Sequence, residues 1–389
     1  MMKHNLLTTT TIAMLLASGA YAQETIKIGV LTPLSGTYAG IGQQVRWGID
    51  QSVEEINAAG GIAGRQIELV YEDSEANPAV AVTKAEKLFT VDNVDFLTGT
   101  VNSGATLAVG QVADRADKLI ATTVSFSDAI TGSGCSPNVF RVNARAGQQS
   151  VALAAWLKQE KPGAKVYYLG PDYEMGRSTV AAFKERAESV GATSTGQVFA
   201  PLDSKDYSQY FGQLRAARPD VLYTSVAGND TVRLFTQMND FGVSDGLTIL
   251  GASGTVTAQN INAIGAAAEG FITGVGYSVL IDSPENKAFT EAFRERNGAD
   301  PDLYGADSYG LLFAYKAAVE AAGATDTDSV RASLEGLSWD TPQGTKTIRA
   351  GDHQAMQPMY VVEVKNGQFT IARSIAGEDA IGPDTCDKF

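Results

Sequence analysis

The sequence predicts an α/β protein with two lobes, each organised around a sheet of parallel strands. Strand-like apolar runs alternate with helix-like segments at the spacing expected of βαβ units. This alternation pauses near residues 135–142 and then restarts, and the chain of 389 residues is longer than one typical core requires. Together these observations favour two α/β lobes over a single domain.

The first lobe begins with Thr25–Leu31, an alternating β-branched run typical of a strand. Apolar residues of the next element recur at helical spacing from Val45 to Ile56, and the helix stops at Asn57–Gly61, where glycine permits a left-handed end. Strands and helices then alternate up to the pause. They are the strands 66–71, 94–98 and 119–125 and the helices 79–90 and 103–116.

The second series has the same rhythm and predicts the second lobe. Its expected helices are 148–160, 175–190, 207–217 and 231–241, and its expected strands are 165–169, 193–199, 221–226, 247–251 and 270–275. Beyond Gly276 we expect helices at 286–297 and 305–322. The last element is a hairpin at 359–371, because Asn366-Gly367 at its centre favours a tight turn.

The composition is that of a folded protein, with 44% hydrophobic and 19% charged residues. The formal net charge of −14 is dispersed along the chain, which is typical of a solvated surface. Nucleic acid is a poor partner for such a surface.

The N-terminus predicts a secretory signal peptide over residues 1–22. Lys3 and His4 precede an apolar run, and Ala20-Tyr-Ala22 has the A-x-A pattern of a cleavage site. No cysteine stands at that site, and no later stretch is apolar for long enough to cross a bilayer. We therefore expect export with cleavage after Ala22.

Two cysteines, Cys135 and Cys386, are the whole cysteine content. An even pair in an oxidising compartment favours a disulfide. It would close a loop of roughly 250 residues, for which the chain-entropy model gives on the order of 4–5 kcal/mol. The alternative is two unpaired thiols, one of them in the C-terminal tail.

The turn between strand 94–98 and helix 103–116 is the first candidate binding element. The first N–H groups of a helix lack intrahelical partners, and Asn102 or Ser103 can cap some of them. The helix dipole adds partial positive charge, so a carboxylate would be favoured there. The alternative is an ordinary capped α/β turn.

Several separated blocks then resemble a known family, the periplasmic substrate-binding proteins of branched-chain amino-acid type ABC transporters. The blocks are Ile28-Gly-Val-Leu-Thr-Pro-Leu-Ser-Gly36, the segment 56–73, Cys135-Ser-Pro-Asn-Val-Phe-Arg141, Asp172-Tyr-Glu-Met-Gly-Arg177 and Ala268-Glu-Gly-Phe271. The resemblance covers essentially the whole mature chain. It implies two Rossmann-like lobes joined by three crossovers that close on a ligand like a hinge.

On this pattern, lobe 1 comprises 23–143 and 276–355, and lobe 2 comprises 144–275 together with a returning segment and tail, 356–389. The ligand would lie in the cleft, at the carboxyl ends of the strands of both lobes. The resemblance places the carboxylate-binding serine on Ser103, beside Asn102. The other implied ligand-binding residues are Val124, Ser125, Phe126, Tyr173, Ala227, Ser253 and Tyr304.

One departure from the family bears on the ligand. Members that bind α-amino acids carry an acidic residue where this chain has Ser253. Closing an ammonium group into a dry cleft without a counter-charge costs several kcal/mol, whereas micromolar binding amounts to only ~8 kcal/mol. Either another carboxylate (Asp128, Asp172, Asp230 or Asp307) substitutes and the ligand is a branched-chain amino acid, or the ligand is an aromatic or organic carboxylate or an amide.

The sequence gives no support for an enzyme. The mature chain has one histidine, His353, and neither a G-x-S-x-G elbow nor zinc-ligand spacing occurs. The resemblance therefore implies a monomeric binding protein without cofactor or metal, which delivers a small molecule to an inner-membrane ABC permease. The alternative is a ligand-sensing receptor subunit on the same fold, because both roles need ligand-driven closure.

Overall fold

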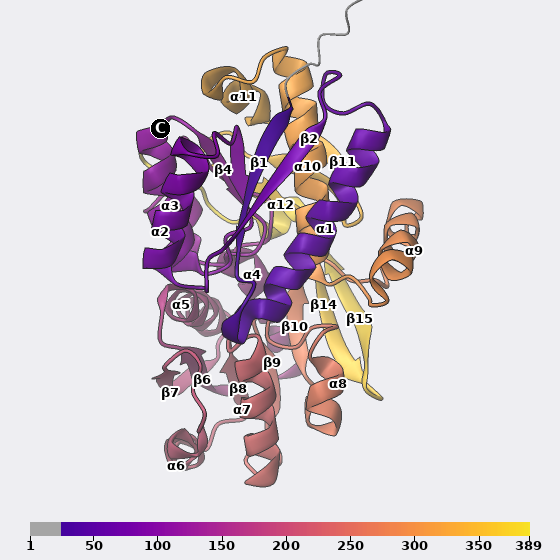
Figure 1. The fold of residues 1–389 in the computed structure, drawn as a ribbon. Helices are drawn as coiled ribbons and strands as arrows, with labels where there is room; N and C mark the ends of the chain where they lie inside the picture. Colours follow the sequence, from indigo (N-terminus) through magenta and orange to yellow (C-terminus); the bar gives the residue numbers. More distant parts are fainter. Residues whose placement is uncertain (1–24) are drawn as a thin grey trace, which may run out of the picture.

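The computed structural model describes residues 25–389, so the expected signal peptide lies outside the described residues. Figure 1 shows two lobes stacked one above the other, and the C-terminus lies at the upper, N-terminal lobe. Both lobes are α/β units with parallel strands. The predicted fold class is confirmed.

Lobe 1 is built on a five-stranded parallel sheet in the order β2-β1-β3-β4-β5. Its strands are β1 (Ile26–Thr32), β2 (Ile67–Asp73), β3 (Phe96–Thr98), β4 (Leu119–Thr122) and β5 (Val139–Arg141). Its helices are α1 (Ala39–Ala58), α2 (Pro78–Thr90), α3 (Ser103–Ala116), α9 (Pro284–Asn297), α10 (Leu303–Ala322) and α11 (Thr327–Leu334). Helices α1 and α10 pack together on one face of the sheet, and α2 and α3 pack together on the other (Figure 1).

Strand β1 shows why helices cover both faces. Ile28 and Val30 belong to the apolar cluster beneath α1 and α10, whereas Leu31 belongs to the cluster beneath α2 and α3. All three side chains are fully buried. A parallel strand that is apolar on both faces has to be covered on both, which is the usual condition of such sheets.

Lobe 2 is built on a seven-stranded sheet in the order β15-β14-β10-β9-β8-β6-β7. Its strands are β6 (Lys165–Pro171), β7 (Thr193–Ala200), β8 (Val221–Thr224), β9 (Thr248–Gly251), β10 (Ile272–Val275), β14 (Met359–Lys365) and β15 (Gln368–Ile375). Strands β6 to β10 are parallel, and the hairpin of β14 and β15 adds antiparallel strands at one edge. Its helices are α4 (Ala146–Glu160), α5 (Glu174–Ser189), α6 (Ser208–Ala217), α7 (Asn229–Asp240), α8 (Ile261–Ile264) and α12 (Gly377–Ala380).

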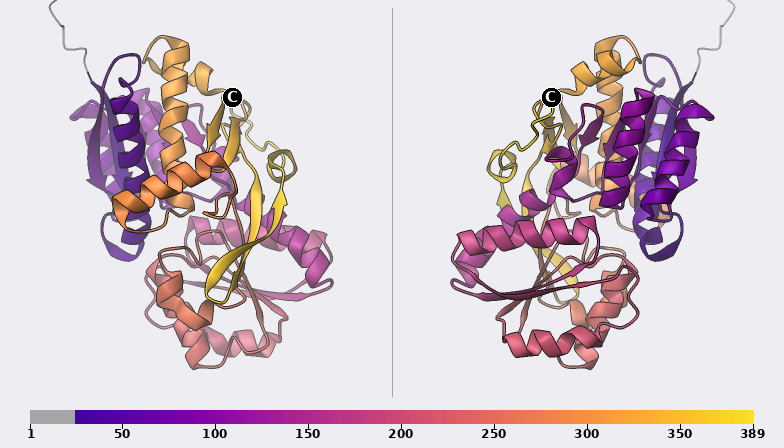
Figure 2. Two further views of the ribbon diagram at one scale, coloured as in Figure 1. Left: turned by 90° about the vertical axis from the view of Figure 1, so that its right-hand side faces the viewer. Right: turned by 90° about the vertical axis from the view of Figure 1, so that its left-hand side faces the viewer.

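The chain passes between the lobes three times, after β5, after β10 and before β14. Figure 2 shows the last of these passages, in yellow, running from the upper lobe into the lower sheet. A small antiparallel sheet of β11 (Ser338–Thr341), β12 (Gly344–Ile348) and β13 (Ala355–Met356) precedes it. We did not expect this sheet, because strands of two to five residues are too short to show a period.

Buried polar side chains hold the crossovers together. Arg141 is fully buried, and its Nε donates to Gln354 Oε1 at 2.6 Å. Lys346 forms a buried ion pair with Asp307. His353 is buried as well, and its ring stacks on Phe140 at a centroid distance of 3.9 Å. The one histidine among the described residues is therefore part of the packing.

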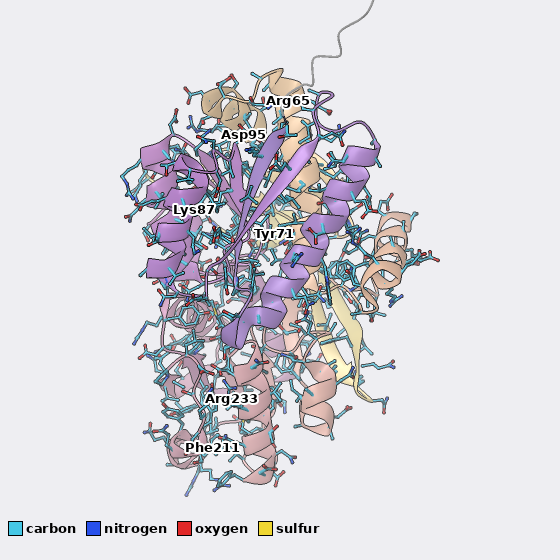
Figure 3. All side chains as sticks on the ribbon, in the orientation of Figure 1. Arg65, Tyr71, Lys87, Asp95, Phe211 and Arg233 are labelled. Atoms are coloured by element: carbon cyan, nitrogen blue, oxygen red, sulfur yellow. A yellow bond between two sulfur atoms is a disulfide. The ribbon has the colours of Figure 1, made fainter. Side chains whose placement is uncertain are left out.

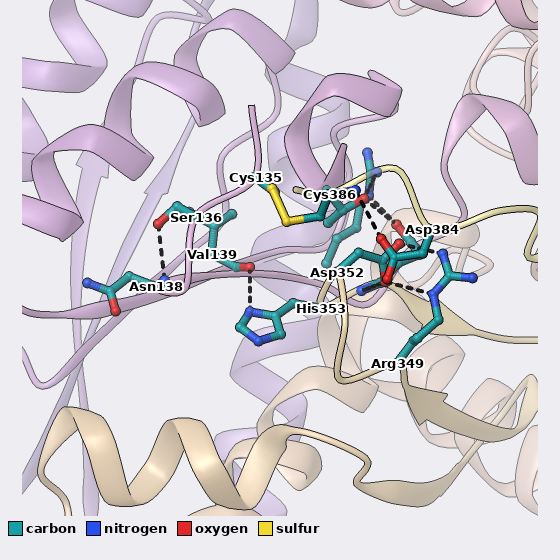
Figure 4. The surroundings of a disulfide bond; sticks show 12 residues. Cys135, Ser136, Asn138, Val139, Arg349, Asp352, His353, Asp384 and Cys386 are labelled. Atoms are coloured by element: carbon teal, nitrogen blue, oxygen red, sulfur yellow. Dashed lines mark hydrogen bonds and ion pairs between the residues drawn. A yellow bond between two sulfur atoms is a disulfide. The ribbon is translucent and has the colours of Figure 1, made fainter. Parts of the chain in front are cut away.

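The C-terminal tail returns to lobe 1 and is bonded there. Cys135 and Cys386 form a disulfide, with their Cα atoms 5.8 Å apart (Figure 4). Arg349, paired with Asp352, donates from Nη1 to the carbonyl of Gly382 at 2.8 Å. Among residues 25–389, no helix is both long and apolar enough to span a membrane.

Candidate functional site

A small cavity lies where the two lobes meet, and its wall is mainly apolar and aromatic. Lobe 1 contributes residues from strand-end loops and from the first turns of α1 and α10, and lobe 2 contributes residues after β6 and β8. The lining residues are Tyr38, Ile41, Val101, Val124, Phe126 and Tyr304 from lobe 1 and Tyr173, Met175 and Ala227 from lobe 2. We call this the cleft cavity.

Tyrosine hydroxyl groups provide the polar atoms of this lining. The hydroxyls of Tyr38 and Tyr173 lie 2.9 Å apart, across the boundary between the lobes. Burial raises the pKa of both tyrosines, so both are neutral hydroxyls at any physiological pH. Phe126 and Tyr304 stack on each other in lobe 1 at a centroid distance of 6.2 Å. Such a wall suits a flat apolar group.

The N-terminus of α3 has the capped geometry that the sequence predicts. Asn102 is the N-cap, and its side chain accepts the N–H of Ala105 at 3.1 Å. Ser103 is fully buried, and its Oγ accepts the N–H of Ser127 at 3.2 Å. Helix α5 begins close by, because a Cβ added to Gly104 would lie 3.9 Å from the Cβ of Glu174. The positive ends of α3 and α5 are therefore near each other at the cleft.

Direct contacts between the lobes show that the structure is in a closed form. Thr37 donates to Asp203 at 2.9 Å, and Ser127 donates to Glu174 at 2.6 Å. Arg233 on α7, labelled in Figure 3, reaches Thr37 Oγ1 at 3.4 Å and also pairs with Asp203. The contacts of Thr37 join α7 and the loop after β7 to the loop before α1. The contact of Ser127 joins the loop after β4 to the start of α5.

Two glycines allow the lobes to approach this closely. Gly228 has a positive φ of 63°, and a Cβ at this position would lie 2.6 Å from the carbonyl oxygen of Thr37. A Cβ at Gly254 would overlap the hydroxyl of Tyr304 and lie 3.2 Å from Phe126. Any side chain at either position would therefore push the lobes apart.

The structure brings five of the nine ligand-binding residues suggested by the sequence to the cleft cavity. They are Val124, Phe126, Tyr173, Ala227 and Tyr304. The other four, Asn102, Ser103, Ser125 and Ser253, do not line it. The hydroxyl of Ser125 donates to the carbonyl of Val101 at 3.0 Å and lies 2.6 Å from Thr106 Oγ1, so it is committed within lobe 1.

Four lining residues were missed by the sequence analysis: Tyr38, Ile41, Val101 and Met175. Ile41 and Met175 lie in first helical turns and look like ordinary core positions. Tyr38 could have been found, since it is an aromatic residue in the loop that follows the first strand. Val101 is an apolar residue in the turn before α3, where only the polar residues indicated a binding site.

The four carboxylates considered as counter-charges are all engaged elsewhere. Asp172 pairs with Arg177, and Asp230 pairs with Arg233. Asp307 pairs with Lys346, and burial raises its pKa to about 6. Asp128 accepts the N–H of Gly147 at 3.0 Å and faces Arg145 at 3.8 Å. None of the four lines the cleft cavity.

Within residues 25–389, no group of three or more His, Cys, Asp and Glu side chains is placed to hold a metal ion. The arrangement offers instead a small apolar cavity, neutral hydroxyls and two nearby helix N-termini. The single histidine among the described residues contacts Val139 and Glu335 and does not line this cavity.

Comparison with known proteins gives three findings. A family model described as "Periplasmic binding protein" matches residues 25–368. A Leu/Ile/Val-binding protein homolog of Brucella melitensis is 28% identical over 335 residues, covering 85% of this chain and 88% of the relative.

Two solved structures are similar over nearly their whole length. One is an ABC transporter solute-binding protein of Rhodopseudomonas palustris HaA2 in complex with p-hydroxybenzoic acid. It is 27% identical, covers 92% of this chain and 98% of its own, and has a TM-score of 0.84. The other, from R. palustris BisB5 in complex with 3,4-dihydroxybenzoic acid, is 25% identical, covers 91% and 98%, and also has a TM-score of 0.84.

Proposed function

Starting from the premise that this chain belongs to the periplasmic binding protein family, we propose that its ligand is a small aromatic or otherwise apolar carboxylate. The general role is that of the family: a solute-binding protein of an ABC transporter captures a small ligand and acts with a permease. Transport is favoured over sensing, because both solved relatives are ABC transporter solute-binding proteins. The family comprises transport binding proteins and not enzymes.

The observation that carries the proposal is that no acidic side chain lines the cleft cavity. Its lining contains four aromatic side chains and no acidic residue. The four alternative carboxylates each have a cation as partner. The ammonium group of an α-amino acid, held within this lining beside its own carboxylate, would have no acidic side chain to pair with, at a cost of several kcal/mol. Aromatic acids are the ligands named for the two solved relatives.

We propose that the anionic end of the ligand lies near the N-terminus of α3 and that its ring lies between the aromatic side chains. Ser103 and the first amides of α3 supply hydrogen-bond donors and partial positive charge. Phe126, Tyr304 and Tyr173 supply flat apolar surfaces from both lobes. Closure then excludes water from both ends of the ligand.

A thermal-shift screen tests this assignment. Benzoate and hydroxybenzoates should raise the melting temperature in a concentration-dependent manner, whereas leucine and valine should not. Isothermal titration of the strongest hit then gives the affinity. Stabilisation by leucine or valine, with none by any aromatic acid, would refute the proposed ligand class and leave the family assignment intact.

We further propose that the protein is exported, cleaved after Ala22 and active as a monomer. Intact mass measurement of protein recovered from the periplasm tests the cleavage site. Light scattering coupled to size exclusion, with and without ligand, tests the monomer.

A further inference from the structure

A second cavity lies next to the cleft cavity at the crossover after β10. Residues of both lobes line it: the loop 253–258 and the β14–β15 hairpin from lobe 2, and residues 301–303 from lobe 1. Val275 and Tyr277 complete its wall at the crossover. We call this cavity the hinge chamber.

The hinge chamber and the cleft cavity share a wall. Leu303 lines the chamber, and the next residue, Tyr304, lines the cleft cavity. On the other lobe, Ser253 lines the chamber, and the next residue, Gly254, lies against the Tyr304 hydroxyl. One aromatic ring and one glycine therefore separate the two spaces.

Two polar atoms of the chamber lining have no hydrogen-bond partner among the described residues. They are Asp302 Oδ2 and Ser253 Oγ. Both residues are buried, with 5% and 1% of their surface exposed. The other carboxylate oxygen of Asp302 is used, since it caps α10 by accepting the N–H groups of Tyr304 at 2.9 Å and Gly305 at 3.2 Å.

Capping explains why Asp302 is acidic but not why half of its carboxylate is buried without a partner. A buried acceptor that lacks a donor costs about 1–3 kcal/mol, and more when it is charged. No lysine or arginine of residues 25–389 forms an ion pair with it, and burial raises its pKa to about 7. The rest of the chamber wall is largely apolar, including Val256, Val275, Leu303 and Val362.

We propose that the hinge chamber is a binding subsite for a hydrogen-bond donor, an ammonium or a hydroxyl group, carried on an apolar body. Asp302 Oδ2 accepts the donor, and Ser253 Oγ supplies a second hydrogen bond. The donor is either the far end of the ligand held in the cleft cavity or part of a separate small molecule. The first case rests on the proposed function, whereas the second does not.

Occupancy of the chamber favours the closed form. Its wall is complete only when the loop 253–258 of lobe 2 meets residues 301–303 of lobe 1. A molecule that contacts both walls therefore binds the closed form better than the open form and shifts the population toward it. By linkage, it also strengthens binding at the cleft cavity.

Three probes separate these cases in isothermal titrations. Benzoate carries a carboxylate without a donor, 4-hydroxybenzoate carries both, and benzylamine carries an ammonium donor without a carboxylate. The variants are Asp302→Asn and Ser253→Ala. Asparagine can keep the helix cap through its Oδ1 while turning an amide donor toward the chamber, and this donor cannot bind an ammonium.

The control variant is Ser225→Ala. Ser225 Oγ is also buried without a partner, but it lies after β8 and does not line the chamber. Thermal melts of all variants without ligand show whether each one folds, and Ser253→Ala tests the proposal if Asp302→Asn does not fold.

We expect both chamber variants to bind at least one donor-bearing probe about tenfold more weakly than Ser225→Ala does. The affinity for benzoate should change by less than about twofold. If affinity is lost only for 4-hydroxybenzoate, the donor in the hinge chamber is the far end of the cleft ligand. If affinity is lost for benzylamine, the donor belongs to a separate molecule. Unchanged affinities for both donor probes, or no binding of either by the wild type, would overturn the proposal. Failure of benzoate alone to bind would count against the proposed function only.

Discussion

The two lobes meet at the cleft with different chemistry. On the lobe 1 side, the hydroxyl groups of Ser103 and Ser125 are bonded within the lobe, Ser103 to Ser127 and Ser125 to Val101. On the lobe 2 side, polar groups at the rim bond across the boundary, as Asp203 does to Thr37 and Glu174 does to Ser127. Part of the lobe 1 surface, around Ser103 and Ser125, is thus organised before closure, whereas these rim groups of lobe 2 gain partners by closing.

This difference separates two kinds of mutation. Changes on the lobe 1 side should alter which ligand is recognised, because they alter a surface that exists in both the open and the closed form. Changes on the lobe 2 side should alter the closing equilibrium, because its contacts exist only in the closed form. The predictions below test this separation in order of expected effect.

The largest effect should come from Gly254→Ala. The added Cβ would overlap the hydroxyl of Tyr304, whose ring is buried and stacked on Phe126 and cannot swing away. We expect an affinity loss of about 100-fold or more in titrations, roughly 3 kcal/mol, with little change in the melting temperature of the free protein. Gly212→Ala on α6 is the matched control, because a Cβ there meets nothing within 4 Å. Equal affinity of the two variants would show that closure does not need this contact.

Ser103→Ala should have the next largest effect, and it acts on recognition. The variant loses a buried hydroxyl at the N-terminus of α3 and leaves the N–H of Ser127 without its acceptor. We expect ligand binding to weaken by ~1–3 kcal/mol. Ser52→Ala is a suitable control, because Ser52 is equally buried but donates to Ile49 within α1. If both variants bind the ligand equally well, Ser103 is not part of the site.

Asp302→Asn should change stability in a pH-dependent way, without any ligand. The folded-state pKa of Asp302, about 7, lies above its ordinary value of 3.8, so its favourable contribution is complete below pH 3.8 and is lost as the pH rises through 7. We expect the asparagine variant to be more stable than the wild type by roughly 1–2 kcal/mol at pH 8, because the neutral amide removes the cost of burying a charge. The gain is limited because one buried polar atom of the amide still lacks a partner. Urea unfolding at pH 8 and at pH 5 checks this, and the difference should shrink at pH 5. If the difference in unfolding free energy between the variant and the wild type is the same at both pH values, Asp302 does not have the raised pKa.

The smallest effect should come from Tyr173→Phe. It removes one hydroxyl of the pair that joins the lobes at 2.9 Å and leaves Tyr38 without that partner. We expect about a three- to tenfold loss of affinity, near 1 kcal/mol. A double-mutant cycle with Tyr38→Phe measures the coupling, and the double variant should bind about as well as either single one. If the binding free-energy losses of the two single variants add up fully in the double variant, the two hydroxyls do not act as a pair.

The sequence predicted the fold class and much of the cleft, because both depend on local and periodic signals. Alternating apolar runs located the strands, and loops at their carboxyl ends contained Phe126, Tyr173 and Ala227, which line the cleft cavity. Helix α10 was expected at 305–322 and is found at Leu303–Ala322. Its capping by Asp302 lies at the boundary, where periodicity carries least information.

The parts that were not predicted depend on contacts between distant segments. Ser253 was expected to face the ligand, yet it lines the hinge chamber, because Gly254 and Tyr304 from different lobes separate the two spaces. Tyr38 and Met175 enter the cavity only because the lobes close over them. The pairing of Asp307 with Lys346, 39 residues away, likewise follows from tertiary packing. By contrast, Asp230 pairs with Arg233, three residues further along α7.

The most direct test of the account is a crystal structure of the protein grown with benzoate. We expect the carboxylate near Ser103 at the N-terminus of α3 and the ring in contact with Phe126, Tyr304 and Tyr173, between closed lobes. Benzoate bound outside the cleft cavity, or bound with its carboxylate directed away from α3, would contradict the account.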